Sequence, residues 1–243
     1  MSKKAIHWSG VFPAVSTQFR SDYSLDLDAT HAVMKNLVKD GVSGLVVCGS
    51  VGENTSLSTD EKLQIIEVAK DAAGGKIPVS AGVAEFTTAF AQKMAKEAER
   101  VGVDGIMVMP ALVYSSKPHE TAAHFRSVAS ATDLPIMVYN NPPIYKNDVT
   151  PDILATLTDC DNIVCFKDSS GDTRRFIDLR NTVGDRRGRL DLRNVQRLPA
   201  RRGNVIPSRP PAALRRGDGA VPLVHAAAAS RCASGSGAVH QAV

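Results

Sequence analysis

One lysine of this sequence stands where a nucleophilic amine could form. Lys167 follows the apolar residues 163–166, and this β-branched and aromatic run, with polar residues on both sides, predicts a strand buried on both faces. An ammonium at the rim of such a strand loses hydration, which favours the neutral amine and lets it form an imine with a carbonyl substrate. Taken alone, a lysine in this position more often extends to water, so only the residues around Lys167 can show whether it is reactive.

Three further groups could serve the same chemistry. Tyr139 ends another predicted strand and could pass protons to and from a carbonyl or carbinolamine oxygen, and Ser50 could relay a proton. Backbone N–H groups beside Gly49 and Gly52 could hold a carboxylate. Each group alone has an ordinary explanation, as a strand-end aromatic or as part of a turn. Together with Lys167 they fit one reaction, imine formation with a carbonyl substrate that carries a carboxylate.

The elements that must position these groups repeat as strand, then helix. The predicted strands cover residues 10–16, 44–48, 78–83, 104–110, 134–139 and 163–166. The predicted helices cover residues 25–40, 58–74 and 87–100, and a fourth begins near Pro118. About six such units without a Gly-x-Gly-x-x-Gly fingerprint favour an α/β fold of the TIM (β/α)8 barrel type over a doubly wound dinucleotide fold. A barrel gathers the carboxyl ends of its strands at one mouth, here residues 49–54, 110–114, 139–141 and 167–169.

Length and composition limit the classes of protein to which the chain can belong. A chain of 243 residues with 43% hydrophobic and 22% charged residues suits one large globular domain, and no apolar run reaches the roughly 18 residues of a membrane helix. The basic start lacks a following apolar region, so we expect no signal peptide and a cytoplasmic location. The cysteines at positions 48, 160, 165 and 232 form no C-x-x-C pair and have no histidine at zinc spacing, so neither a metal site nor a disulfide framework is indicated.

The last part of the chain differs from the rest in amino-acid composition. Residues 186–243 hold eleven arginines, no lysine and two aspartates, a local formal charge of +9, which leaves −5 of the total +4 for residues 1–185. We therefore divide the chain into a partial barrel at 1–185 and an Arg/Ala/Pro-rich tail at 186–243, expected to be disordered. The tail has no aromatic residue to stack on bases, so we expect no nucleic-acid partner.

Three stretches resemble one superfamily, that of dihydrodipicolinate synthase and N-acetylneuraminate lyase, the class I pyruvate-type aldolases. The stretches are residues 49–58, 135–142 and 163–171, in the family's order, within a resemblance that covers roughly residues 8–185. The resemblance implies Lys167 as the Schiff-base lysine, Tyr139 as the proton-relay phenol, and Ser50 with the Val51 backbone as binders of the carboxylate of a 2-oxo acid. It implies no metal and no organic cofactor.

The same resemblance implies the substrate-binding residues. Val51, through its backbone, and Gly49 would bind the carboxylate of a 2-oxo acid together with the Ser50 loop. Tyr114 completes the expected set, either in this chain's own site or in that of a neighbouring subunit, because the family forms tetramers of barrels. We therefore expect a homotetramer, a small-molecule substrate and no membrane partner.

Two departures from the synthase pattern bear on the substrate. Dihydrodipicolinate synthases usually carry two threonines where this chain has Ser50 and Val51, and an arginine for the second substrate's carboxylate where this chain has residues 144–147. Isoleucine cannot replace a bidentate donor, although Tyr145 or Lys146 could substitute. Residues 139–150 most resemble the branch that deaminates 1-pyrroline-4-hydroxy-2-carboxylate in hydroxyproline breakdown. That deaminase is our first interpretation, and a 4-hydroxy-tetrahydrodipicolinate synthase or another pyruvate aldolase is the alternative.

The tail supplies none of the family's last two strands. Codon degeneracy allows the bases for residues 190–199, read one base later, to spell Trp-Ile-Ser-Gly-Met-Ser-Asn-Ala-Phe-Pro, which resembles the family's eighth strand. We therefore hypothesise a frameshift near Asp185. An inactive truncated homologue, or a non-catalytic subunit that joins an intact paralogue, remains an alternative to the working enzyme, since an unclosed barrel leaves open sheet edges.

Overall fold

The protein is described by a computed structural model that covers residue 6 and residues 8–183. The basic tail, and with it the expectations of disorder, of a frameshift and of missing strands, lies outside these residues. The described strands are β1 (Leu45–Val47), β2 (Val79–Val83), β3 (Gly105–Val108), β4 (Ile136–Asn140) and β5 (Ile163–Asp168). The helices are α1 (Leu27–Lys39), η1 (Asn54–Ser56), α2 (Thr59–Ala73), α3 (Thr88–Arg100), α4 (Pro118–Ala129), α5 (Pro142–Tyr145), α6 (Pro151–Thr156) and α7 (Arg175–Val183).

The five strands form one parallel sheet in chain order, from β1 to β5. This confirms the α/β class. The predicted first strand at residues 10–16 is wrong as a strand: in the described structure this stretch makes a single parallel bridge, Ala14 to Val46. Pro13 explains part of the difference, because it has no N–H to donate and only its carbonyl takes part, accepting from Val46 at 3.0 Å.

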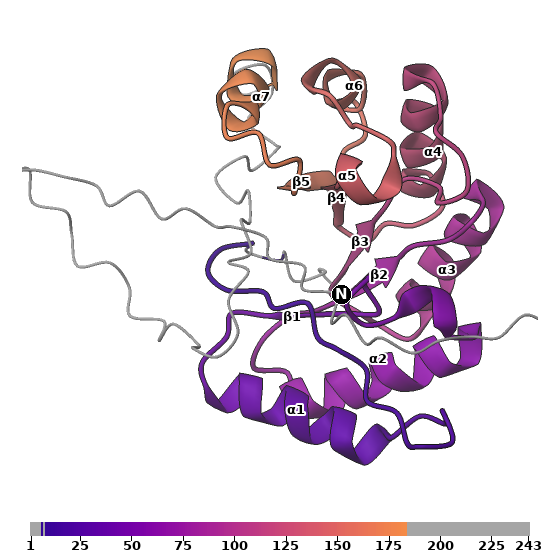
Figure 1. Cartoon of the computed structure of the whole chain (residues 1–243). Coiled ribbons are helices and arrows are strands. Elements are labelled where there is room, and N and C mark those ends of the chain that lie inside the picture. Colours follow the sequence, from indigo (N-terminus) through magenta and orange to yellow (C-terminus); the bar gives the residue numbers. More distant parts are fainter. Residues whose placement is uncertain (1–5, 7, 184–243) are drawn as a thin grey trace, which may run out of the picture.

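The helices follow one another around the outside of the sheet, and Figure 1 shows them in an arc from α1 and α2 through α3 and α4 to α6 and α7. Side chains that alternate along each strand therefore meet two different layers. One set packs against the helices, and examples are Val47, Val108 and Val138. The other set forms a smaller apolar cluster on the inner face, with Val46, Met107, Met109, Met137, Tyr139 and Cys165 joined by Trp8 and Phe12.

Local sequence signals start the helices where they are needed. Ser58 and Glu61 form the predicted capping box of α2, with a bond of 2.8 Å from the Ser58 N–H to the Glu61 carboxylate. Thr87 caps α3 in a similar way, accepting from the Phe90 N–H at 3.2 Å. In the part of the chain that the structure describes, no helix is both long and apolar enough to span a membrane.

Candidate active site

Lys167 and Tyr139 are direct partners in the sheet. They lie opposite each other in the β4–β5 register, on the inner face. The Lys167 Nζ lies 4.3 Å from the centre of the Tyr139 ring, in a cation–π arrangement. Two strands predicted to end at one mouth thus bring together the amine and the phenol that the sequence suggested.

A register shift in β5 makes this pairing possible. Ile136 pairs with Ile163, but Met137 pairs with Cys165, so Val164 is an extra residue on β5. Without it Tyr139 would pair with Phe166, and Lys167 would turn to the opposite face, because a shift of one residue exchanges the faces of a strand. The irregularity therefore directs the lysine into the inner face.

The surroundings of Lys167 disfavour its charge. The side chain is 3% exposed, and its Nζ contacts the Met107 sulfur at 3.8 Å. Among the residues that the structure describes, no carboxylate forms an ion pair with it. Burial lowers the pKa of Lys167 from 10.5 to about 8. Roughly one lysine in ten is then neutral at pH 7, compared with fewer than one in a thousand for a solvated lysine.

The hydroxyl groups of the site form a short chain of contacts. The Tyr139 hydroxyl accepts a hydrogen bond of 3.0 Å from the Asn141 side-chain amide. The Tyr139 ring meets the Tyr145 ring edge to face, with centroids 5.8 Å apart. The Tyr145 hydroxyl shares a hydrogen bond of 2.5 Å with Ser50 Oγ. Ser50, Tyr139 and Lys167 are therefore brought together, with Tyr145 between the first two.

Tyr145 is the site residue that the sequence reasoning did not include. It was considered only as a replacement for a missing arginine. Its position depends on α5, whose two prolines preset a helical turn after Asn141, and on a hydrogen bond partner 95 residues away. The one available signal was an aromatic hydroxyl close behind Tyr139 in sequence.

The Ser50–Tyr145 bond also reports the curvature of the sheet. Ser50 follows β1 and Tyr145 follows β4, and three strand spacings of about 4.8 Å would separate these strands by roughly 14 Å in a flat sheet. A direct hydrogen bond between their loops requires the sheet to curl around a common mouth. The described strands thus have the curvature of a barrel wall.

Buried hydrogen bonds hold the loop that carries Ser50. Cys48, at the end of β1, has a positive φ of 53°, which is uncommon for a residue with a side chain. The buried Asn54 amide holds this turn by donating to the Cys48 carbonyl at 2.7 Å. Thr17 donates to the Gly52 carbonyl at 2.8 Å. Both bonds hold the loop in place while the Ser50 side chain stays exposed.

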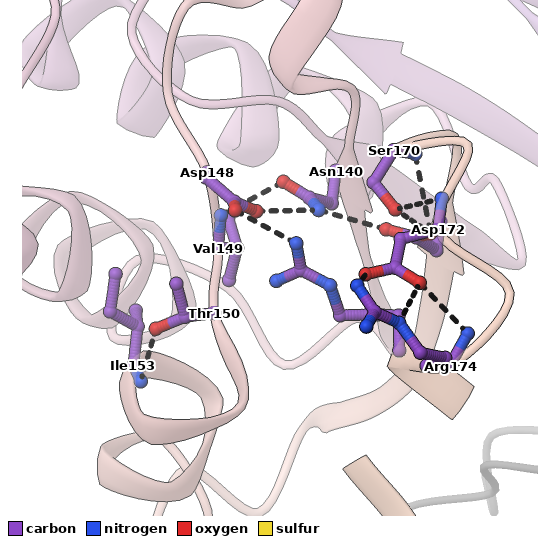
Figure 2. A network of polar contacts seen from close by, with 10 residues as sticks. Asn140, Asp148, Val149, Thr150, Ile153, Ser170, Asp172 and Arg174 are labelled. Atoms are coloured by element: carbon purple, nitrogen blue, oxygen red, sulfur yellow. Dashed lines mark hydrogen bonds and ion pairs between the residues drawn. The ribbon is translucent and has the colours of Figure 1, made fainter. Parts of the chain in front are cut away.

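A polar network around the buried Asn140 holds the ends of β4 and β5, and Figure 2 shows it converging on that residue. The Asn140 amide donates to Asp148 at 3.1 Å and to Asp168 at 2.8 Å, and its oxygen accepts from the Val149 N–H at 2.8 Å. Asp148 in turn accepts from Arg175 at 2.8 Å. Since Asp168 follows Lys167 directly, this network fixes the backbone that carries the amine.

The predicted substrate-binding residues lie at different depths. Gly49 begins the loop, and a Cβ there would meet the Met107 methyl group at 3.2 Å. Val51 is 56% exposed at the rim, beside Ser50. Tyr114 is 81% exposed, and within residues 8–183 no hydrogen bond or ring contact links its side chain to Lys167 or Tyr139. The structure does not bring Tyr114 into the cluster.

Neither Ile144 nor Lys146 supplies a guanidinium group for a second carboxylate. Ile144, an uncharged side chain on α5, is exposed. Lys146 uses its Nζ to donate to the Pro143 carbonyl at 3.2 Å. In the described part of the chain no three His, Cys, Asp or Glu side chains are grouped as metal ligands.

Comparison with known sequences finds one family. The model of the dihydrodipicolinate synthetase family matches residues 7–190. A 4-hydroxy-tetrahydrodipicolinate synthase of Methanospirillum hungatei JF-1 is 41% identical over 169 residues, which are 68% of this chain and 57% of that protein. An uncharacterized DapA-like lyase of Rhizobium meliloti is 39% identical over 161 residues, 66% of this chain and 53% of its own.

Comparison with solved structures finds the same family. YagE, an E. coli K12 prophage protein of the dihydrodipicolinic acid synthase family solved with pyruvate, superposes with a TM-score of 0.68 at 32% identity, over 72% of this chain and 59% of its own. A dihydrodipicolinate synthase of Acinetobacter baumannii, also complexed with pyruvate, gives 0.71 at 26% identity, over 73% and 61%. The chain thus spans less than two thirds of the relatives it matches. Within that span sequence and fold agree, and the chain belongs to the dihydrodipicolinate synthetase family.

Proposed function

We propose that this chain carries the amine centre of an imine-forming lyase for small 2-oxo acids, with Lys167 as the nucleophile. The observation that carries the proposal is a lysine that is 3% exposed, has a pKa lowered to about 8 by burial, and lies against a tyrosine at the mouth of a parallel sheet. Reactive lysines are made in this way, by removing water without supplying a counter-charge.

The step is the formation of a Schiff base. The neutral Nζ attacks C2 of the 2-oxo acid, the C=O π electrons move to oxygen, and a proton transferred from nitrogen to that oxygen gives a carbinolamine. The hydroxyl then takes a second proton and leaves as water, and a C=N bond forms. Tyr139 is the proposed proton donor and acceptor, because its phenol shares the inner face with the amine. Ser50, with the backbone of Gly49 and Val51, is proposed to bind the carboxylate, and Tyr114 is proposed as a rim residue.

Pyruvate is the preferred substrate for this step. Several relatives are named 4-hydroxy-tetrahydrodipicolinate synthase, and two of the similar structures hold pyruvate. These relatives favour the synthase alternative over our first interpretation, the 1-pyrroline-4-hydroxy-2-carboxylate deaminase. One observation still favours the deaminase as a second candidate: the exposed Ile144 offers no charge for the carboxylate of a second substrate.

Borohydride trapping tests the proposal on the full chain. Incubation with pyruvate and then sodium borohydride should add one reduced pyruvate unit to the protein, on the peptide that holds Lys167. Lys167→Ala should abolish the adduct, while Lys146→Ala, a change at an exposed lysine, should leave it unchanged. Parallel incubation with 1-pyrroline-4-hydroxy-2-carboxylate should release no ammonia. An unmodified wild-type chain would instead support the inactive truncated homologue.

Two wider expectations accompany this proposal. A cytoplasmic location and assembly as a homotetramer come from the sequence and the family resemblance. Sedimentation equilibrium of the purified chain would test the second, and a monomer at micromolar concentration would contradict it.

A further inference from the structure

Tyr145 connects the two halves of the site. Its hydroxyl lies 2.5 Å from Ser50 Oγ, on the loop after β1, and its ring packs edge to face on Tyr139, at the end of β4. Its backbone N–H donates to the Asn141 carbonyl at 2.9 Å, and the Asn141 side chain donates to the Tyr139 hydroxyl at 3.0 Å. One short turn therefore holds both tyrosines.

Either hydroxyl could donate in the bond between Tyr145 and Ser50, and the phenol is the better donor because it is the stronger acid. Burial is the main cause that raises the pKa of Tyr145 above its usual 10, so the phenol stays protonated at neutral pH. A phenol that donates to Ser50 Oγ leaves the Ser50 proton free to point away from Tyr145. Likewise the Tyr139 oxygen already accepts from Asn141, so its own proton is available elsewhere. Both free protons belong to groups around the inner face that Lys167 occupies.

We infer that Tyr145 is a positioning residue of the imine site, which orients the Ser50 hydroxyl through its own hydroxyl and holds the Tyr139 ring beside Lys167. The inference rests on the proposed function and deepens it, because it gives the site a second phenol supplied by the same chain. A turn of four residues with two prolines is a rigid support for such a task, since each proline fixes one backbone angle.

The test follows the rate of adduct formation on Lys167 in the full chain. Samples taken at intervals after adding pyruvate are quenched with borohydride, and the modified fraction is measured by mass spectrometry over a range of pyruvate concentrations. Tyr145→Phe keeps the ring and removes the hydroxyl, and it should slow the maximal rate about tenfold to a hundredfold. Ser50→Ala should have the same effect. Ser50→Thr, which keeps a hydroxyl, should restore most of the rate.

Coupling between the two positions separates positioning from packing. The double variant with Tyr145→Phe and Ser50→Ala should be no slower than either single variant, because both changes break one hydrogen bond. Tyr23→Phe, the same change at a tyrosine that is 87% exposed, should leave the rate unchanged. Circular dichroism of each variant shows whether it is folded, and if Tyr145→Phe does not fold, Ser50→Ala against Ser50→Thr carries the comparison.

The outcomes distinguish the two proposals. A wild-type chain that gives no adduct on Lys167 overturns the proposed function, and the inference with it. A wild-type adduct that forms at the same rate in Tyr145→Phe, or single effects that multiply in the double variant, overturns the role of Tyr145 and leaves the proposed function standing.

Discussion

Two lysines of this chain are equally buried and differ in what surrounds them. Lys62, on α2, is 4% exposed, and its Nζ lies 2.7 Å from a Glu85 carboxylate oxygen. Lys167 is 3% exposed, and its Nζ has a thioether and an aromatic ring as its contacts in the described structure. Burial alone therefore does not make a lysine reactive. Burial without a counter-charge does, because it raises the neutral fraction of the amine.

A thiol contact links the helix of Lys62 to the end of the strand that precedes the Ser50 loop. The Lys62 carbonyl accepts a contact of 3.8 Å from the Cys48 thiol, so the ion pair lies directly behind the loop that carries Ser50. Burial raises the pKa of Cys48 to about 12, against the opposing charge of Lys62. The thiol thus stays protonated and does not compete with Lys167 as a nucleophile.

The largest expected effect comes from breaking the paired lysine. Lys62→Met leaves the Glu85 carboxylate largely buried without its partner, and breaking a buried pair in this way should lower the free energy of unfolding by about 3 kcal/mol. Urea unfolding followed by circular dichroism measures the change. The double variant Lys62→Met with Glu85→Leu is the control, and it should recover most of the loss. Equal stabilities of wild type and Lys62→Met would show that the pair contributes nothing.

The unpaired lysine should behave in the opposite way. Its pKa falls from 10.5 to about 8 on folding, so at pH 7 the folded state bears a penalty that Lys167→Met removes, with a gain in unfolding free energy of up to ~3 kcal/mol. Between the two pKa values the unfolded chain binds more protons, so this gain should be full below pH 8 and shrink as pH rises toward 10.5. Urea titrations of both chains at pH 7 and pH 10 measure it. A Lys167→Met chain that is less stable at pH 7 would contradict the account.

The difference between the two lysines was only partly predictable. Lys167 and Tyr139 could be placed together because each follows a buried run, and parallel strands end at a common mouth. The pairing of Lys62 with Glu85 could not be predicted from the sequence. These residues belong to a helix and to a loop 23 positions away, and no periodic pattern links them. The extra residue Val164 was also unpredictable, because a bulge depends on how two strands meet rather than on either strand alone.

Two further features of the structure could not be predicted from the sequence. The first strand was predicted from an apolar run, and the described structure keeps only one bridge of it, because backbone pairing and not apolar content defines a strand. Asn140 reads as an ordinary polar residue at the end of β4, yet it is fully buried and joins Asp148 to Asp168. Both depend on contacts between segments far apart in sequence.

A smaller effect should appear in the pH dependence of imine formation. The neutral fraction of Lys167 should rise about tenfold between pH 7 and pH 9, because its pKa is about 8. The initial rate of borohydride-trapped adduct, measured at low pyruvate concentration, should follow this rise and level off above pH 9. A rate that keeps rising tenfold per pH unit beyond pH 9 would show that the amine titrates like a solvated lysine.

The central claim is that burial without a counter-charge favours the neutral amine of Lys167, and nuclear magnetic resonance measures its titration directly. The full chain is labelled with ¹³C at the lysine ε carbon, the Lys167 signal is assigned by its loss in Lys167→Met, and its chemical shift is followed from pH 6 to pH 11. We predict a midpoint near 8, as burial requires. A midpoint at or above the ordinary value of 10.5 would contradict the account.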